Sequence, residues 1–108
     1  MREIKLTRNE NGKSIEAQVG ETVLIELPEN PTTGYFWTLN MVQGKETVYV
    51  SNSSYKAVTN SEIGGKGMRT FVLDVRSSGT ATIEVKLRRQ WEPESAAIDR
   101  FDAVIKAR

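Results

Sequence analysis

The feature that most constrains the fold of this chain is a strict alternation of apolar and polar residues, clearest in the segment ATIEVKLR at residues 81–88. Successive side chains of a β-strand point to opposite faces of its sheet, so a period of two predicts a strand with one buried and one solvated face. Residues 81–88 are therefore expected to form a half-buried strand. Arg88, at the polar phase of the same pattern, is expected to be a solvated strand position.

The same period recurs along most of the chain. It is clear at residues 23–27, 71–75 and 101–105, and shorter candidates lie at 4–6, 15–17, 35–39, 48–50 and 55–58. Residues that favour turns separate these segments, at Asn11-Gly12, Gly20-Glu21, 30–34, Gly44, Asn52-Ser53, 64–67 and Ser78-Gly79. No helix of useful length fits between them. We therefore expect an all-β protein of about eight strands.

Short strands joined by frequent turns are typical of two antiparallel sheets packed as a sandwich. Trp37 stands early in the third major strand, where an immunoglobulin-like fold places a core tryptophan, so we assign Trp37 to the core. In this topology, loops that are two connections apart leave the sandwich at the same end. The prediction therefore brings together three loops, at residues 30–35, 63–68 and 89–93.

Composition excludes several classes of function. The 108 residues contain no linker rich in Pro or Ser, which predicts one domain over residues 1–108. A formal net charge of +1 gives no indication of a nucleic-acid partner, and no apolar run is long enough to cross a bilayer. Because the chain has no Cys and no His, it lacks thiolate nucleophiles, imidazole metal ligands and the Ser-His-Asp triad. We expect neither an enzyme nor a bound cofactor.

The N-terminal segment MREIKL alternates charged and apolar residues and lacks the apolar stretch of a secretory signal. We therefore expect either a cytoplasmic protein or the mature form of a secreted or vesicular one.

The loop NPTTGY at residues 30–35 carries the most specific chemistry in the chain. Pro31 has a fixed φ and restricts Asn30 to extended conformations, while Gly34 permits a backbone geometry that a side chain would disfavour. Thr32 and Thr33 are β-branched, so they lose little freedom when a partner contacts them, and they are expected to display free hydroxyls. The sequence therefore predicts a rigid, uncharged tip.

Two further segments complete a set of motifs. The first is GGKG at Gly64, Gly65, Lys66 and Gly67, followed by Phe71, and the second is RQW at Arg89, Gln90 and Trp91. Together with Asn30, Pro31, Thr32, Thr33, Gly34 and Tyr35, they resemble the three loops of the chagasin family, which are immunoglobulin-like inhibitors of papain-type cysteine proteases. The first motif matches the family pattern without a mismatch. Lys66 replaces the second of three glycines, and Gln90 replaces the proline of an Arg-Pro-Trp motif.

The resemblance implies a reversible, competitive, tight-binding inhibitor of cathepsin L-like and cathepsin B-like proteases, monomeric when free. The tip at Thr32 and Thr33 would cover the catalytic Cys-His pair of the protease, and Trp91 would contact its primed side. The glycine-rich loop would approach the unprimed side through its backbone. Gln90 should leave its loop less pre-organised than proline would, at a cost of ~0.5–1 kcal/mol. Lys66 would alter selectivity through its charge.

Other interpretations remain open from the residues alone. Tyr35 either buttresses the first loop from behind, which we favour, or enters the protease cleft. The GGKG segment is equally typical of a flexible hairpin, and it lacks the hydroxyl residue and the helix of a phosphate-binding loop. The principal alternative function is a carbohydrate-binding or adhesion module that uses Trp91, Tyr35 and Tyr55 as stacking platforms.

Overall fold

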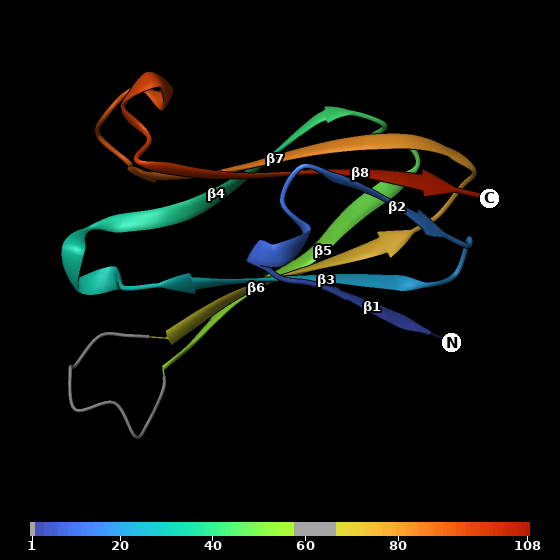
Figure 1. Ribbon diagram of the computed structural model, residues 1–108, viewed down its shortest axis with the longest axis horizontal. Helices are drawn as coiled ribbons and strands as arrows, with labels where there is room; N and C mark the ends of the chain where they lie inside the picture. Colours follow the sequence, from blue (N-terminus) through green and yellow to red (C-terminus); the bar gives the residue numbers. More distant parts are fainter. Residues whose placement is uncertain (1, 58–66) are drawn as a thin grey trace.

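The computed structural model describes residues 2–57 and 67–108, which form two four-stranded β-sheets packed face to face (Figure 1). The strands are β1 (Glu3–Leu6), β2 (Lys13–Ala17), β3 (Thr22–Glu29), β4 (Tyr35–Gln43), β5 (Val48–Ala57), β6 (Gly67–Val75), β7 (Gly79–Arg89) and β8 (Asp99–Ala107). One sheet has the order β1-β3-β6-β5 and the other β2-β8-β7-β4. The predicted all-β, immunoglobulin-like sandwich is confirmed.

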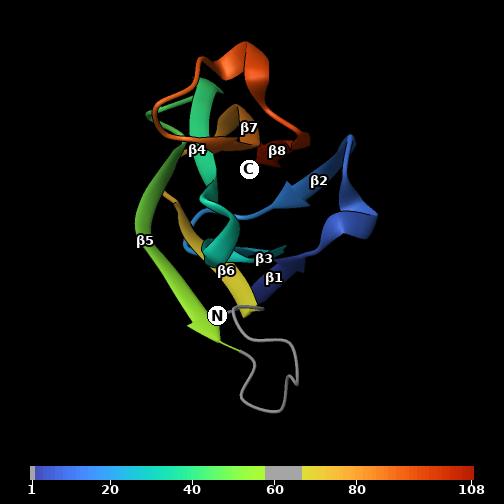
Figure 2. The same cartoon turned by 90° about the vertical axis from the view of Figure 1, so that its left-hand side faces the viewer.

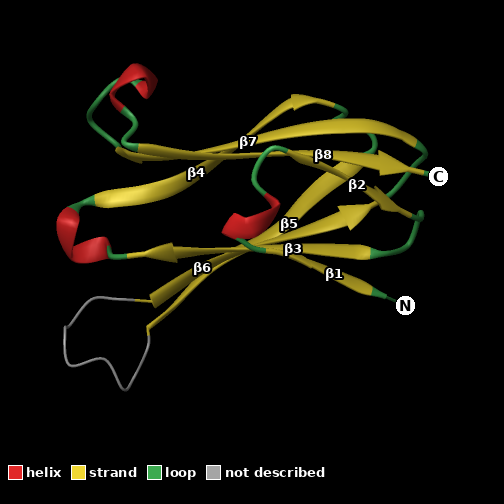
Figure 3. Cartoon of the chain, viewed as in Figure 1, coloured by secondary structure: helices red, strands yellow, loops and turns green. Residues whose placement is uncertain are grey.

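The helical segments of the described residues are three single 3₁₀ turns, η1 (Arg8–Glu10), η2 (Pro31–Thr33) and η3 (Glu94–Ala96), shown in Figure 3. Each lies in a connection between strands. No helix in the described ranges is long and apolar enough to span a membrane.

Two strand pairs are parallel, which corrects the expectation of purely antiparallel sheets. β1 pairs with β3 and β2 pairs with β8 in parallel, while the other pairings are antiparallel. A tight hairpin forces an antiparallel pair, whereas a longer crossover leaves the direction free. The chain crosses between the sheets after β1 through η1, so no hairpin joins β1 or β2 to its partner.

The predicted turn at Asn52-Ser53 is also wrong, because β5 runs without interruption from Val48 to Ala57. Residues 48–50 and 55–57 of the two predicted strands belong to one long edge strand, and its pairing with β6 shifts register between Val50 and Asn52. Val58, the last residue of the second predicted strand, lies outside the described residues. A β-bulge of this kind absorbs an extra residue without ending the strand. Pairing with β6 therefore overrides the local turn preference of Asn and Ser.

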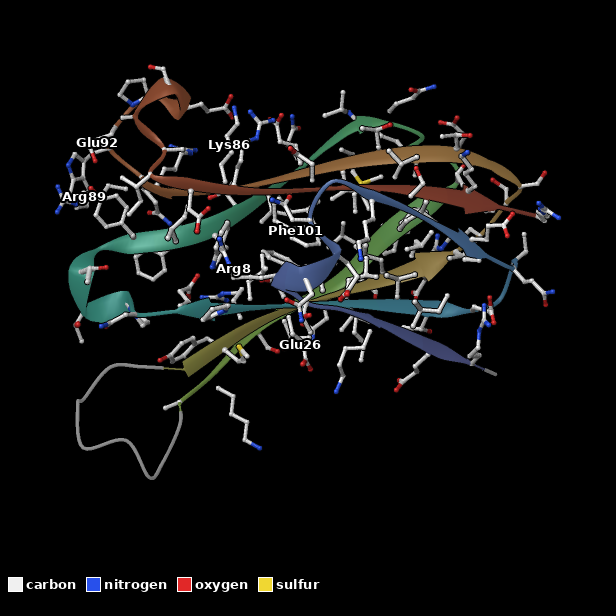
Figure 4. All side chains as sticks on the ribbon, in the orientation of Figure 1. Arg8, Glu26, Lys86, Arg89, Glu92 and Phe101 are labelled. Atoms are coloured by element: carbon white, nitrogen blue, oxygen red, sulfur yellow. The ribbon has the colours of Figure 1, made fainter. Side chains whose placement is uncertain are left out.

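Alternation correctly identified the residues between the sheets. The inward-facing apolar side chains in the middle of the four central strands are buried, and they are Val23, Ile25, Leu27, Phe71, Leu73, Val75, Ala81, Ile83, Val85, Phe101, Ala103 and Ile105. Leu87, which the pattern also assigned to the buried face, is only partly buried. Phe101 is among the largest fully buried side chains and lies between the two sheets (Figure 4). Trp37 is buried in the same cluster, as predicted.

The strand ends that flank the three predicted loops lie at one end of the sandwich, opposite the two termini (Figure 1). β3, β5 and β7 end there, and β4, β6 and β8 begin there. Register agrees with this view, since Glu29 pairs with Gly67, Ala57 with Gly67, and Tyr35 with Arg89. Figure 2 looks onto this end and shows η2 between the β7–β8 connection and the ends of β5 and β6. We call this the loop end.

Candidate functional site

The first loop, between β3 and β4, is a single helical turn held by its own side chains. Asn30 is the N-cap of η2, with an extended backbone, and its Oδ1 accepts the backbone N–H of Thr32 at 3.1 Å. Pro31 occupies the first helical position, where its missing N–H costs nothing. Gly34 ends the turn with φ at +82° and donates its N–H to the carbonyl of Pro31. The predicted roles of Asn30, Pro31 and Gly34 in the backbone are confirmed.

Both threonine hydroxyls are engaged within the loop, which corrects the expectation that they are free. The Thr32 hydroxyl donates to Asn30 Oδ1 at 2.5 Å, and the Thr33 hydroxyl donates to the Asn30 carbonyl at 2.8 Å. The Thr33 oxygen also accepts the N–H of Tyr35 at 3.3 Å. Because each hydroxyl has one proton to donate, the exposed tip offers methyl groups and oxygen lone pairs to a partner. The two threonines therefore stiffen the loop, and they also form its exposed surface.

The base of the first loop is held by residues that sequence reasoning missed. Trp37 donates its indole Nε1–H to the Pro28 carbonyl at 2.8 Å and its backbone N–H to the Glu29 carboxylate at 2.8 Å. That carboxylate also binds the guanidinium of Arg69 on β6. The available signal was the alternation itself, since Glu29 continues the inward-facing series of β3 and places a charge where the pattern demands an apolar residue.

The third loop, between β7 and β8, begins with a stack of three side chains. The guanidinium carbon of Arg89 lies 4.5 Å from the ring centre of Tyr35 and 5.9 Å from that of Trp91. Trp91 is 75% exposed, the largest exposed fraction among the big apolar side chains of the described residues. A cation between two aromatic rings is attracted to the faces of both. Tyr35 thus lies against Arg89 at the start of the third loop, and its expected role of buttressing the first loop stays a prediction.

A turn and a second arginine shape the rest of this loop. The N–H of Glu92 donates to the Arg89 carbonyl at 3.1 Å, which closes a β-turn with Gln90 and Trp91 at its centre. Arg88 donates from Nη1 to the Glu92 carbonyl at 3.0 Å, and its Nε is buried. The prediction of a solvated Arg88 is therefore wrong, because the turn folds back over this side chain. Figure 4 shows Arg89 and Glu92 at the loop end.

The second predicted loop falls mostly on residues that the structure does not describe. Gly64, Gly65 and Lys66 lie outside the described ranges, so their predicted roles stay predictions. Gly67 is the first residue of β6 and is buried. A Cβ on Gly67 would overlap the Lys56 carbonyl and the Tyr55 hydroxyl, so close approach of β5 requires glycine here.

The first and third loops contact each other. The Cη2 atom of Trp91 stands 3.3 Å from the position that a Cβ on Gly34 would occupy. Beneath the loops, the sandwich opens into a mostly apolar groove of about 750 Å³. Its lining includes Pro28, Tyr35, Met68, Leu87, Arg89 and Ile98. The structure thus brings Thr32, Thr33, Arg89, Gln90 and Trp91 to one end of the molecule, on connections far apart in the sequence.

Within residues 2–57 and 67–108, no group of three or more acidic, His or Cys side chains is arranged to hold a metal ion. A guanidinium lies over the ring of each tyrosine that the carbohydrate-binding interpretation required, Arg89 over Tyr35 and Arg69 over Tyr55.

Comparison with known proteins agrees with the motifs. Residues 16–105 match the family model described as Chagasin family peptidase inhibitor I42. Chagasin of Trypanosoma cruzi is 30% identical over 106 residues, covering 95% of this chain and 96% of the relative. The crystal structure of the cysteine protease inhibitor EhICP2 from Entamoeba histolytica superposes with a TM-score of 0.87 at 24% identity, covering 98% of this chain and 96% of that one.

A third similar structure is that of PbICP-C in complex with falcipain-2, with a TM-score of 0.61 at 20% identity, covering 99% of this chain and 90% of that one. At this identity the likeness concerns the fold. The family model and the trypanosomal relative span nearly the whole chain, and on that ground the chain belongs to the chagasin family of peptidase inhibitors.

Proposed function

We propose that this protein is a reversible, competitive inhibitor of papain-family cysteine proteases and that the loop end enters the active-site cleft. One observation carries the proposal: a rigid, uncharged tip at Thr32 and Thr33 lies beside the exposed ring of Trp91, on separate connections of one stiff sandwich. Family membership supports it, and the related inhibitor EhICP2 is named for the inhibition of cysteine proteases.

The tip would block the catalytic pair without being cleaved because its backbone is a closed turn. The carbonyls of Asn30 and Pro31 accept hydrogen bonds from Thr33 and Gly34 inside the loop. A thiolate attacks a carbonyl carbon efficiently only when the two atoms are aligned at close range, and a turn anchored at both ends need not reach that geometry. An uncharged tip also avoids the cost of burying an unpaired charge.

Trp91 would supply the main anchor on the primed side. Large, rigid aromatic side chains dominate the energetics of many interfaces, and the Trp91 ring already lies beside the Arg89 guanidinium in the free protein. On the unprimed side, Gly64, Gly65 and Lys66 would contact the protease through their backbone, whereas Gly67 is buried in β6. Lys66 would favour proteases with an acidic rim around the cleft. In this proposal the free inhibitor is a monomer.

Titration against papain and a cathepsin L-like protease tests the proposal. The wild type is expected to inhibit with a Ki on the order of nanomolar, as pre-organised interfaces of this class do. Trp91→Ala and the double variant Thr32→Ala/Thr33→Ala should each weaken inhibition by about tenfold or more. The control is Val42→Ala, which removes an exposed apolar side chain from β4 away from the described loops.

Circular dichroism establishes that each variant is folded before inhibition is compared. A wild type that leaves both proteases active at micromolar concentration contradicts the proposal. Inhibition that Val42→Ala weakens as much as Trp91→Ala would place the binding surface elsewhere.

A further inference from the structure

Among the residues that the structure describes, Glu29 is the only ionisable one that is buried, and it directly precedes the first loop. Its side chain is 0% exposed. A buried carboxylate without partners is strongly unfavourable, so its surroundings must satisfy it. At Glu29 those partners come from both sheets.

Both carboxylate oxygens are occupied. Arg69 Nη2 lies 2.8 Å from Oε1, and Arg69 Nε lies 3.1 Å from Oε1 and 3.3 Å from Oε2. The backbone N–H of Trp37 donates to Oε2 at 2.8 Å. Planar guanidinium and planar carboxylate groups form paired hydrogen bonds with little freedom of angle. The orientation of the Glu29 side chain is therefore fixed.

The partners place this carboxylate across the base of the first loop. Glu29 precedes Asn30, and Trp37 lies on β4 just beyond Gly34, so one side chain joins the two ends of the loop. A second bond joins the same ends, from the Trp37 indole to the Pro28 carbonyl. Through Arg69 the carboxylate also fixes this base against β6, whose first residue, Gly67, pairs with Glu29.

Arg69 is in turn held from β5. Its guanidinium lies 5.7 Å from the ring centre of Tyr55, and Nη1 lies 3.4 Å from the Ser53 hydroxyl. The network therefore connects the strands that support the first loop with the strands that support the second.

We propose that Glu29 and Arg69 are positioning residues for inhibition: this ion pair sets the angle at which Thr32 and Thr33 leave the sandwich. This inference rests on the proposed function, since the angle matters only if the tip enters a protease cleft. A rigidly held loop binds with less loss of entropy, so loosening its base should weaken binding in a protein that remains folded. The pair acts through the loop and does not itself contact the protease.

The test compares Glu29→Gln with Glu26→Gln. Both substitutions remove one negative charge from β3, but Glu26 forms a longer ion pair with Lys5, 3.7 Å apart, and its side chain is 26% exposed. Glu29→Gln is expected to raise the Ki for papain by about tenfold, and Glu26→Gln by less than about twofold. If Glu29→Gln does not fold, Arg69→Lys serves in its place, because it keeps the charge and removes the paired geometry.

A double-mutant cycle separates positioning from general stability. In the Thr32→Ala/Thr33→Ala background, Glu29→Gln should raise the Ki by no more than about twofold, because the contacts that it positions are already gone. Inhibition is measured at a temperature well below the midpoint of thermal unfolding of every variant. Equal effects in the two backgrounds would overturn the inference and leave the proposed function intact.

Amide hydrogen exchange supplies a readout that needs no protease. The amides of Thr33, Gly34 and Trp37 should exchange about tenfold faster in Glu29→Gln than in Glu26→Gln. The amide of Ile105 in β8, which lies away from the loop, should exchange at the same rate in the two variants. Unchanged exchange at the loop would overturn the inference. If the wild type fails to inhibit papain, the proposed function fails, and exchange alone then decides whether the pair holds the loop.

Discussion

Trp91 rests against Gly34, with its Cη2 atom 3.3 Å from the point where a Cβ on that glycine would stand. Gly34 also has φ at +82°, in the left-handed region that glycine tolerates best. This position therefore satisfies two requirements at once, since it ends the helical turn of the first loop and leaves room for the anchor of the third. The contact couples two motifs that are separate in the sequence.

Gly34→Ala is expected to weaken inhibition more than its effect on stability explains. The left-handed backbone should cost about 1 kcal/mol of unfolding free energy, and the new methyl group should displace the ring of Trp91. Urea denaturation measures the free energy of unfolding, and the Ki for papain measures the loss of inhibition that follows from displacing the ring. Gly12→Ala is a matched control, because Gly12 has φ at +79° with nothing within 4 Å of the added Cβ. Equal losses of inhibition in both variants would contradict the coupling.

Thr33→Val should reduce inhibition although it preserves the shape of the side chain. It removes the hydroxyl that donates to the Asn30 carbonyl and accepts from the Tyr35 amide. Each such hydrogen bond contributes about 0.5–1.5 kcal/mol, so we expect the Ki to rise by about threefold to tenfold. Thr33→Ser, which keeps the hydroxyl, should inhibit nearly as well as the wild type. If Thr33→Val inhibits fully and Thr33→Ser does not, the methyl group is the important part.

Gln90→Pro should strengthen inhibition. Gln90 occupies the second position of the turn closed by the Glu92 N–H, where proline is favoured in common β-turns. Proline reduces the freedom of the unfolded chain and should add about 0.4–1 kcal/mol to stability. We expect a higher unfolding midpoint in thermal denaturation and a lower Ki. A lower midpoint would mean that the backbone at Gln90 does not accept the φ of proline.

Stability should fall in acid partly through two surface carboxylates. The pKa of Glu10 is held below its ordinary value mainly because the Thr7 N–H donates to it at 2.7 Å, and that of Glu21 mainly because the Gln18 N–H donates to it at 2.6 Å. Groups with a lowered pKa in the folded state contribute stability above the ordinary Glu value of about 4.3, and this contribution is lost as the pH falls through the folded pKa.

The double variant Glu10→Gln/Glu21→Gln should therefore be less stable than the wild type at neutral pH. The difference should shrink between about pH 5 and pH 3, since the wild-type carboxylates then become protonated. Urea denaturation across this range provides the measurement. A stability difference that stays constant with pH would show that these carboxylates do not contribute through their ionisation.

The strands were predictable because a period of two depends only on local sequence. The inward residues of β7 and β8 follow directly from it, whereas the burial of Trp37 was predicted from its position in an immunoglobulin-like fold. The pattern failed at Asn52, where pairing with β6 maintains a strand that local composition disfavours. It also missed the parallel placement of β1 and β2, since partner and direction are settled by strands distant in the sequence.

By itself, the sequence determined the fold class, because the alternation of apolar and polar residues depends only on the local backbone. It also determined the turn at Asn30 to Gly34, since Pro31 and Gly34 restrict the backbone where they stand, and the motif in this turn indicated the family. Only the tertiary structure decided how these parts cooperate. It placed Trp91 against Gly34 and set Arg69 beside Glu29. Contacts of this kind depend on which strands become neighbours, and that follows from the packing of the two sheets rather than from any local pattern.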